Sequence, residues 1–179
     1  MAETKGLFFD FKGVGDEGFR EVPAGRYQFV TKEWFVYKKE ETDNKVMVCF
    51  SEITDDPEHN GEFKGERIAN FQTITPNSHG FVLSLMKTLG VIKDDDRKED
   101  GSLDFLMAFG EVNDKGWMSL THALVNGEKR DIVGIKGVAV MAFDKKADRV
   151  VVKTIEPAGN ATASGVVAKQ SKAKVLQDW

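Results

Sequence analysis

Hydrophobic and polar residues alternate over five stretches of this chain, and the two-residue period predicts five β-strands. β-branched and aromatic residues dominate these stretches, as strands favour. In the first stretch, Tyr27 and Phe29 share one parity while Val30 and Trp34 share the other, which predicts a long, coiled strand with apolar side chains on both faces. The five predicted strands are 26–38, 45–53, 66–74, 138–143 and 149–155.

The hydrophobic period changes after the third predicted strand. Thr75 is suited to cap a helix with Pro76 in its first position, and Gly90 is suited to end it. Apolar residues between them recur at helical spacing, which predicts a helix. A second short helix is predicted over 102–109, and residues 110–134 match no clear pattern. The helical spacing is carried by Phe81, Val82, Leu85, Met86 and Leu89.

Three strands, a helical insert and two further strands follow the element order of a five-stranded OB-type barrel. The predicted fold class is therefore mainly β, a five-stranded OB-type barrel with the helical insert between strands three and four. Residues 1–25 are rich in Gly and Phe and are expected to form an N-terminal arm that packs on the core. The barrel is expected to span 26–156. Residues 157–179 lose the apolar pattern and are predicted to form a flexible C-terminal tail.

Charge and cysteine content narrow the class of protein. The chain carries 25 basic and 29 acidic side chains, a net charge of −4, which argues against a protein that is basic over its whole surface. Residues 129–153 nevertheless hold seven basic residues against three acidic ones, so one local basic face is compatible with the sequence. The single cysteine, Cys49, lies in a strand pattern, which favours a buried, inert thiol. No signal-peptide core and no membrane-length apolar run occurs, so a cytoplasmic protein is expected.

Motifs that would indicate an enzyme are weak throughout the sequence. Residues 13–18 match G-x-G-x-x-G, but Pro23 prevents the helix that a dinucleotide site needs. The acidic run at 94–96 favours a solvated loop, because three consecutive carboxylates point in different directions. We therefore predict a protein that is not an enzyme and that uses no metal or cofactor. The histidines stand singly at His59, His79 and His122.

Cationic and aromatic residues on the predicted strands indicate a different activity. Single-stranded nucleic acid is bound by stacking its bases on aromatic faces and by a cationic track along its backbone. Trp34 lies near several lysines on the first predicted strand, and Arg67 shares a face with Phe71 on the third. The predicted nucleic-acid contacts are Lys32, Trp34, Lys38, Lys39, Arg67, Phe71, Arg149 and Lys153.

The chain also resembles a known family in its turn and core residues. Residues 9–14 (FDFKGV) and 22–27 (VPAGRY) are similar to the opening of phage single-stranded DNA-binding proteins with an OB-type core. The similarity covers roughly residues 8–156. It implies a protein that coats single-stranded DNA without strong sequence preference during phage replication or recombination, in the cytoplasm of the host cell. Four later segments fit the same pattern: 50–54 (FSEIT), 65–68 (GERI), 81–91 and 133–138 (VGIKGV).

The last residues are expected to contact another protein. Leu176, Asp178 and Trp179 form a small apolar and acidic group at the end of the predicted tail, and we predict that they bind a replication or recombination protein. The rest of the tail carries lysines, unlike the strongly acidic tails that many such proteins have. As an alternative, Trp179 folds back onto the barrel or onto a second subunit, which leaves a homo-oligomer open.

A phage structural or assembly protein of β-barrel type is the alternative interpretation of the whole chain. In that case the same aromatic residues would form a protein–protein interface. A small nuclease is a third and weaker class, because no catalytic motif supports it. Salt-dependent binding to oligonucleotides separates the first class from the second, and cleavage that depends on a divalent metal would indicate the third.

Overall fold

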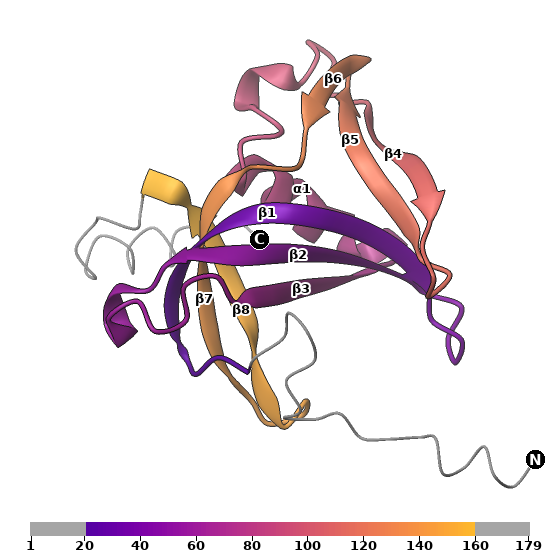
Figure 1. The fold of residues 1–179 in the computed structure, drawn as a ribbon. Coiled ribbons are helices and arrows are strands. Elements are labelled where there is room, and N and C mark those ends of the chain that lie inside the picture. The colour runs from indigo at the N-terminus through magenta and orange to yellow at the C-terminus, as the bar shows by residue number, and fades with distance from the viewer. Residues whose placement is uncertain (1–20, 160–179) are drawn as a thin grey trace, which may run out of the picture.

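The computed structural model describes residues 21–159, and in this range the chain forms one antiparallel β-sheet with a short α-helix packed against it (Figure 1). The helix α1 is His79–Thr88, and short 3-10 turns occur at Pro57–His59, Pro76–Ser78 and Asp94–Asp96. The strands are β1 (Gly25–Lys38), β2 (Lys45–Asp55), β3 (Arg67–Ile74), β4 (Phe105–Val112), β5 (Met118–Val125), β6 (Glu128–Asp131), β7 (Lys136–Asp144) and β8 (Arg149–Pro157).

The long strand β1 organises the sheet because it pairs with three other strands. Along one edge it pairs with β2. Along the other edge, residues 25–30 pair with β7 and residues 34–36 pair with β5. A register irregularity between Thr31 and Glu33 increases the local twist, which allows β1 to serve both partners. The sheet is completed by β3 beside β2, by β8 beside β7, and by β4 and β6, which both pair with β5.

The hydrophobic core lies between the coiled strands and α1. Trp34 is only 2% exposed, and its indole Nε1 donates a 2.7 Å hydrogen bond to the carbonyl oxygen of Ile132. The hydroxyl of the buried Thr31 donates to the same carbonyl at 2.8 Å, so both buried donors are satisfied. Met86 and Leu89 bring α1 into this core. The buried hydrogen bonds fix the segment before β7 against the middle of β1.

The prediction of a mainly β fold is confirmed, and each of the five predicted strands corresponds to a strand of the structure. The predicted helix is confirmed as well. Thr75 caps a 3-10 turn that begins at Pro76, α1 follows directly, and Gly90 lies just beyond the helix with a φ of 77°. Periodicity therefore located these five strands and the helix correctly.

The second predicted helix is wrong, because residues 102–109 run into strand β4. Alternate side chains of this segment separate as they do in a strand: Phe105 and Met107 pack against the core, and Leu106 is 56% exposed. A run with few polar residues obscures this two-residue alternation in the sequence. The unassigned stretch 110–134 holds the end of β4 together with β5 and β6. The segment between α1 and β7 is therefore a three-stranded extension of the sheet.

The expectations about both ends of the chain concern residues outside the described range. Most of the predicted arm (residues 1–20) and most of the predicted tail (residues 160–179) belong there, including Leu176, Asp178 and Trp179. Within residues 21–159, no helix is long and apolar enough to cross a membrane.

Candidate nucleic-acid interface

Aromatic side chains gather on the face of β1, β2 and β3 that points away from the core, and we call this surface the outer face. The register pairs Phe35 with Val48 and Val48 with Phe71, so these three side chains form one row across the strands. Tyr37 stands in the neighbouring row, opposite Val46. Phe71 lies at the β3 end of its row and is 45% exposed. The outer face therefore presents aromatic rings where strands usually present polar side chains.

Trp117 reaches over the outer face from the turn between β4 and β5. Its ring is stacked on Tyr37, with centroids 4.6 Å apart and an interplanar angle of 15°, and on Phe50, at 6.3 Å and 5°. Phe35 contacts Trp117 with a steep interplanar angle at 6.1 Å. Phe50 on β2 lies opposite Glu33, and Glu33 is four residues before Tyr37 on β1. Trp117 therefore fills the space between the rings of Phe50 and Tyr37. We call Tyr37, Trp117 and Phe50 the aromatic stack.

A short turn before β5 holds Trp117 in this position. The side-chain Oδ1 of Asn113 accepts hydrogen bonds from the backbone N–H groups of Lys115 and Trp117, each at 3.0 Å. Gly116 has a φ of 78°, a left-handed conformation that favours glycine. The ammonium nitrogen of Lys115 lies 5.2 Å from the centre of the Trp117 ring, a cation–π contact. The turn thus delivers an aromatic ring and a cation together to the outer face.

Four of the predicted cations are ion-paired with carboxylates. Exposed ion pairs contribute little stability, so exchanging such a carboxylate for a phosphate costs little. The guanidinium of Arg67 also lies 5.1 Å from the ring centre of Phe50, within reach of the aromatic stack. The hydrogen bond from Lys153 lowers the pKa of Asp144 to about 2. The four pairs are Lys32–Glu52 (3.7 Å), Lys38–Asp43 (3.0 Å), Arg67–Glu33 (2.6 Å) and Lys153–Asp144.

The two other predicted cations, Lys39 and Arg149, have no carboxylate within ion-pair distance in the described part of the chain. Lys39 lies in the turn between β1 and β2, and Arg149 opens β8 directly after the β7–β8 turn. The first turn projects at the right of Figure 1 and the second at the bottom. Four exposed lysines that the sequence analysis did not single out lie in or beside these turns or next to Trp117: Lys45, Lys115, Lys145 and Lys146.

Trp34 is a correction to the predicted interface, because its indole ring is buried and cannot stack on a base. The prediction placed Trp34 beside Lys32 on the first strand, and alternate residues of a regular strand share a face. In the structure, Thr31 and Glu33 pair with consecutive residues of β2, which leaves Lys32 as the extra residue of a β-bulge. The bulge turns Lys32 toward solvent and Trp34 toward the core.

The aromatic stack itself was missed at the sequence level. Tyr37 and Phe50 lie in the predicted strands 26–38 and 45–53 but were not proposed as contacts, and Trp117 lies in the stretch that matched no pattern. A usable signal is present in that stretch. Asn113 followed by Gly116 is typical of a tight turn, and a large aromatic residue comes directly after it.

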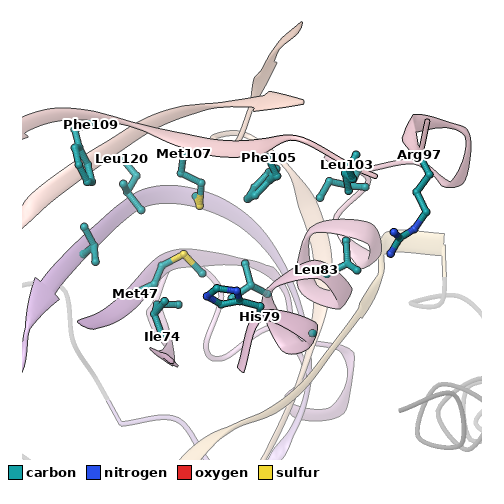
Figure 2. Close-up of a pocket in the computed structure, with 14 residues that line it drawn as sticks. Met47, Ile74, His79, Leu83, Arg97, Leu103, Phe105, Met107, Phe109 and Leu120 are labelled. Carbon is teal, nitrogen blue, oxygen red and sulfur yellow. The ribbon is translucent and has the colours of Figure 1, made fainter. Parts of the chain in front are cut away.

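A separate candidate site lies on the inner side of the same strands. An apolar cleft of about 550 Å³ opens between α1 and β4 (Figure 2). Val36, Met47 and Ile74 contribute to it from β1, β2 and β3. Among the described residues that line the cleft, His79 and Arg97 are the polar side chains and none is a carboxylate. The cleft is lined by aliphatic side chains and by the separate rings of Phe105 and Phe109, and Arg97 is the one Lys or Arg among its described lining residues. It therefore lacks the stacked rings and the cationic track that a nucleic-acid strand needs.

Other candidate chemistry in the described residues has a structural explanation. Asp94 pairs with Lys87 at 3.3 Å, and the hydrogen bond from Arg130 lowers the pKa of Asp96 to about 2. No group of three side chains suited to holding a metal comes together within residues 21–159. Burial raises the pKa of the Cys49 thiol to about 12, so at neutral pH it is protonated and a weak nucleophile.

Comparison with known proteins identifies no relative: no protein-family model, no curated protein and no solved structure matches this chain. The candidate interface is therefore defined by its own geometry. Its components are the aromatic stack, the exposed ring of Phe71, and the cations of the β1–β2 and β7–β8 turns.

Proposed function

We propose that this protein binds single-stranded DNA on the outer face of β1, β2 and β3 and coats it without strong sequence preference. The observation that carries the proposal is the gathering of Phe35, Tyr37, Phe50, Phe71 and Trp117 on one face of three strands. Stacking on aromatic rings binds any unpaired base, because every base has a flat face. Paired bases inside a duplex are stacked on one another, so the same surface favours single strands.

The arrangement of five strands supports an OB-type core for this function. Strands β1, β2, β3, β7 and β8 follow one another in the sheet in the order β3-β2-β1-β7-β8, and α1 falls between β3 and β7 in the chain. β8 also packs close to β3, although no ladder of hydrogen bonds joins the two strands in the described residues. We propose that these five strands are the OB-type barrel, left partly open, and that β4, β5 and β6 are an insertion.

The positions of the lysines in two of the loops agree with the assignment of an OB-type barrel. OB-type proteins bind oligonucleotides on the face of strands two and three, between the loop joining strands one and two and the loop joining strands four and five. The corresponding loops here are 39–44 and 145–148, which contain Lys39, Lys145 and Lys146. A net charge of −4 is compatible with binding, because recognition depends on where the cations lie and not on their sum. Together, the loop lysines and the resemblance to phage single-stranded DNA-binding proteins support a role in phage replication or recombination in the host cytoplasm.

A phage structural or assembly protein is the second candidate, and one observation favours it. Strand β4 carries three strongly exposed apolar side chains, Leu106, Phe109 and Val112, and in the described residues it pairs only with β5. An apolar sheet edge of this kind is suited to contact another protein. It lies outside the aromatic stack, however, and does not account for the cations of the two loops.

Titration of dT oligomers and of a duplex of equal length at two salt concentrations tests the proposal. We expect tighter binding to the single strand and an affinity that falls with salt, with a slope of about −0.7 in log affinity against log salt for each neutralised phosphate. Absence of binding to dT oligomers at low salt would reject the proposal and favour the assembly protein. Cleavage of the oligomer in the presence of Mg²⁺ would contradict the expectation that the protein is not an enzyme.

A further inference from the structure

In the aromatic stack, the flat ring faces of Tyr37 and Phe50 are already in contact with the ring of Trp117. Trp117 lies nearly parallel to Tyr37 and to Phe50, with its ring centroid 4.6 Å from that of Tyr37 and 6.3 Å from that of Phe50. Phe50 is only 8% exposed, and Val48 beneath the stack is fully buried although it points away from the core. A base therefore cannot stack between Tyr37 and Phe50 while Trp117 is in place.

We propose that the space between Tyr37 and Phe50 is a nucleobase slot, that Trp117 fills it in the free protein, and that a base of the bound strand replaces Trp117. This inference rests on the proposed single-stranded DNA binding and adds to it a subsite and the side chain that closes it. An indole and a nucleobase are both flat, conjugated ring systems of similar area, so one can substitute for the other between two parallel rings.

The turn that carries Trp117 is attached in a way that permits this exchange. Strand β5 is joined to β1 by three residue pairs, 34–36 with 118–120, whereas β1 and β2 are joined over ten. The ladder between β4 and β5 has two register irregularities, one on each side of Phe109. Within the turn, Asn113 binds the N–H groups of Lys115 and Trp117. The weak connection lies outside the turn, so the turn moves as one piece.

Lys115 gives the exchange an electrostatic component. In the free protein its ammonium group lies over the Trp117 ring at 5.2 Å, and no described carboxylate pairs with it. When the turn moves out as one piece, Lys115 leaves together with Trp117. The phosphate next to the inserted base then offers it a stronger, charge-assisted partner. The same movement thus opens the slot and supplies a contact to the backbone of the strand.

The sign of the effect of removing Trp117 tests the exchange. If Trp117 must leave, its two stacking contacts oppose binding, and Trp117→Ala should raise the affinity for dT oligomers by roughly fivefold or more. If Trp117 is itself the surface on which bases stack, the same substitution should lower the affinity. An unchanged or lower affinity in a folded variant overturns the inference. Phe143→Ala is the matched control, because it removes an exposed ring from β7, outside the stack and outside the β4–β5 ladder.

A second measurement keeps the inference testable if Trp117→Ala fails to fold. In a Trp179→Phe background the emitting residues are Trp34, which is buried, and Trp117. Saturation with dT oligomer should increase acrylamide quenching of Trp117 if it is displaced, and protection or no change overturns the displacement. The proposed function fails separately: if neither the wild type nor Trp117→Ala binds the oligomer, single-stranded DNA binding itself is rejected. Binding by the wild type with reduced binding by Trp117→Ala rejects only the slot.

Discussion

The two faces of β1 and β2 are built from alternate residues of the same strands, yet they have different chemistry. On the outer face, Phe35 and Tyr37 meet Trp117 in stacked or edge contacts, and free cations lie in the turns nearby. On the inner side, Val36 and Met47 contribute aliphatic surface to a cleft that Phe105 and Phe109 of β4 and the side chain of Arg97 also line. One face is therefore suited to flat, charged polymers, and the other to compact apolar groups.

The comparison shows that the type of apolar residue matters more here than the amount of apolar surface. Val36 and Tyr37 are neighbours in the chain and both are partly buried, but only Tyr37 offers a flat ring to a stacking partner. Branched and sulfur-containing side chains fill irregular space and bind without a preferred orientation. Parallel rings impose one orientation on whatever lies between them. The predictions that follow test whether the two faces are separable.

The largest expected effect is on the inner side. Trp34→Ala should lower the free energy of unfolding by about 3–5 kcal/mol, because it removes a large buried ring and leaves a cavity. It also removes the hydrogen-bond donor to the carbonyl of Ile132. Urea denaturation followed by circular dichroism measures the change. A stable variant with weakened DNA binding would instead place Trp34 at the interface and remove the distinction between the two faces.

On the outer face, Phe71→Ala should weaken binding to dT oligomers by about 1–3 kcal/mol, the range for losing one stacked base. Its ring is 45% exposed, so the folded state should lose little stability. Fluorescence anisotropy gives the affinity and thermal melting gives the stability. Phe143→Ala is a useful comparison, because Phe143 is also strongly exposed but lies on β7. If both variants bind as the wild type does, the outer face is not where the bases stack.

A smaller effect is expected from the free cations. Lys39→Gln combined with Arg149→Gln should make the dependence of log affinity on log salt shallower by roughly 1.4, which is two contacts at about 0.7 each. Lys98→Gln serves as the control, because Lys98 is paired with Asp104 on the loop beside the cleft. Equal slopes for the double variant and the wild type would mean that the strand does not pass these turns.

The sequence predicted the elements with strict periodicity and failed where a local irregularity breaks it. Strand β1 was located correctly, but its bulge at Lys32 reversed the orientation expected for Trp34. The stack was out of reach for a different reason. It joins Tyr37 and Phe50 to Trp117, a residue eighty positions beyond Tyr37, and only the pairing of β1 with β5 brings them together. Contacts between distant segments leave no periodic trace in either segment.

Acid should weaken the loop beside the cleft on the inner side, and this is the smallest change that we predict. Asp96 precedes Arg97 at the edge of the cleft, and the hydrogen bond from Arg130 lowers the pKa of Asp96 from its ordinary value of 3.8 to about 2. The unfolded chain therefore binds a proton at this carboxyl more readily than the folded chain does. The stability that the Asp96–Arg130 pair contributes is complete above pH ~4 and is lost as the pH falls from about 4 to about 2.

Arg130→Met removes the contribution of this pair, so the difference in unfolding free energy between wild type and variant should shrink as the pH falls from about 4 to about 2. Asp144, whose pKa is also lowered to about 2, is present in both proteins and cancels in the difference. Urea denaturation of both proteins at pH 5, 4 and 3 measures the effect. A difference that stays constant across the three pH values would show that the pair does not hold the loop beside the cleft.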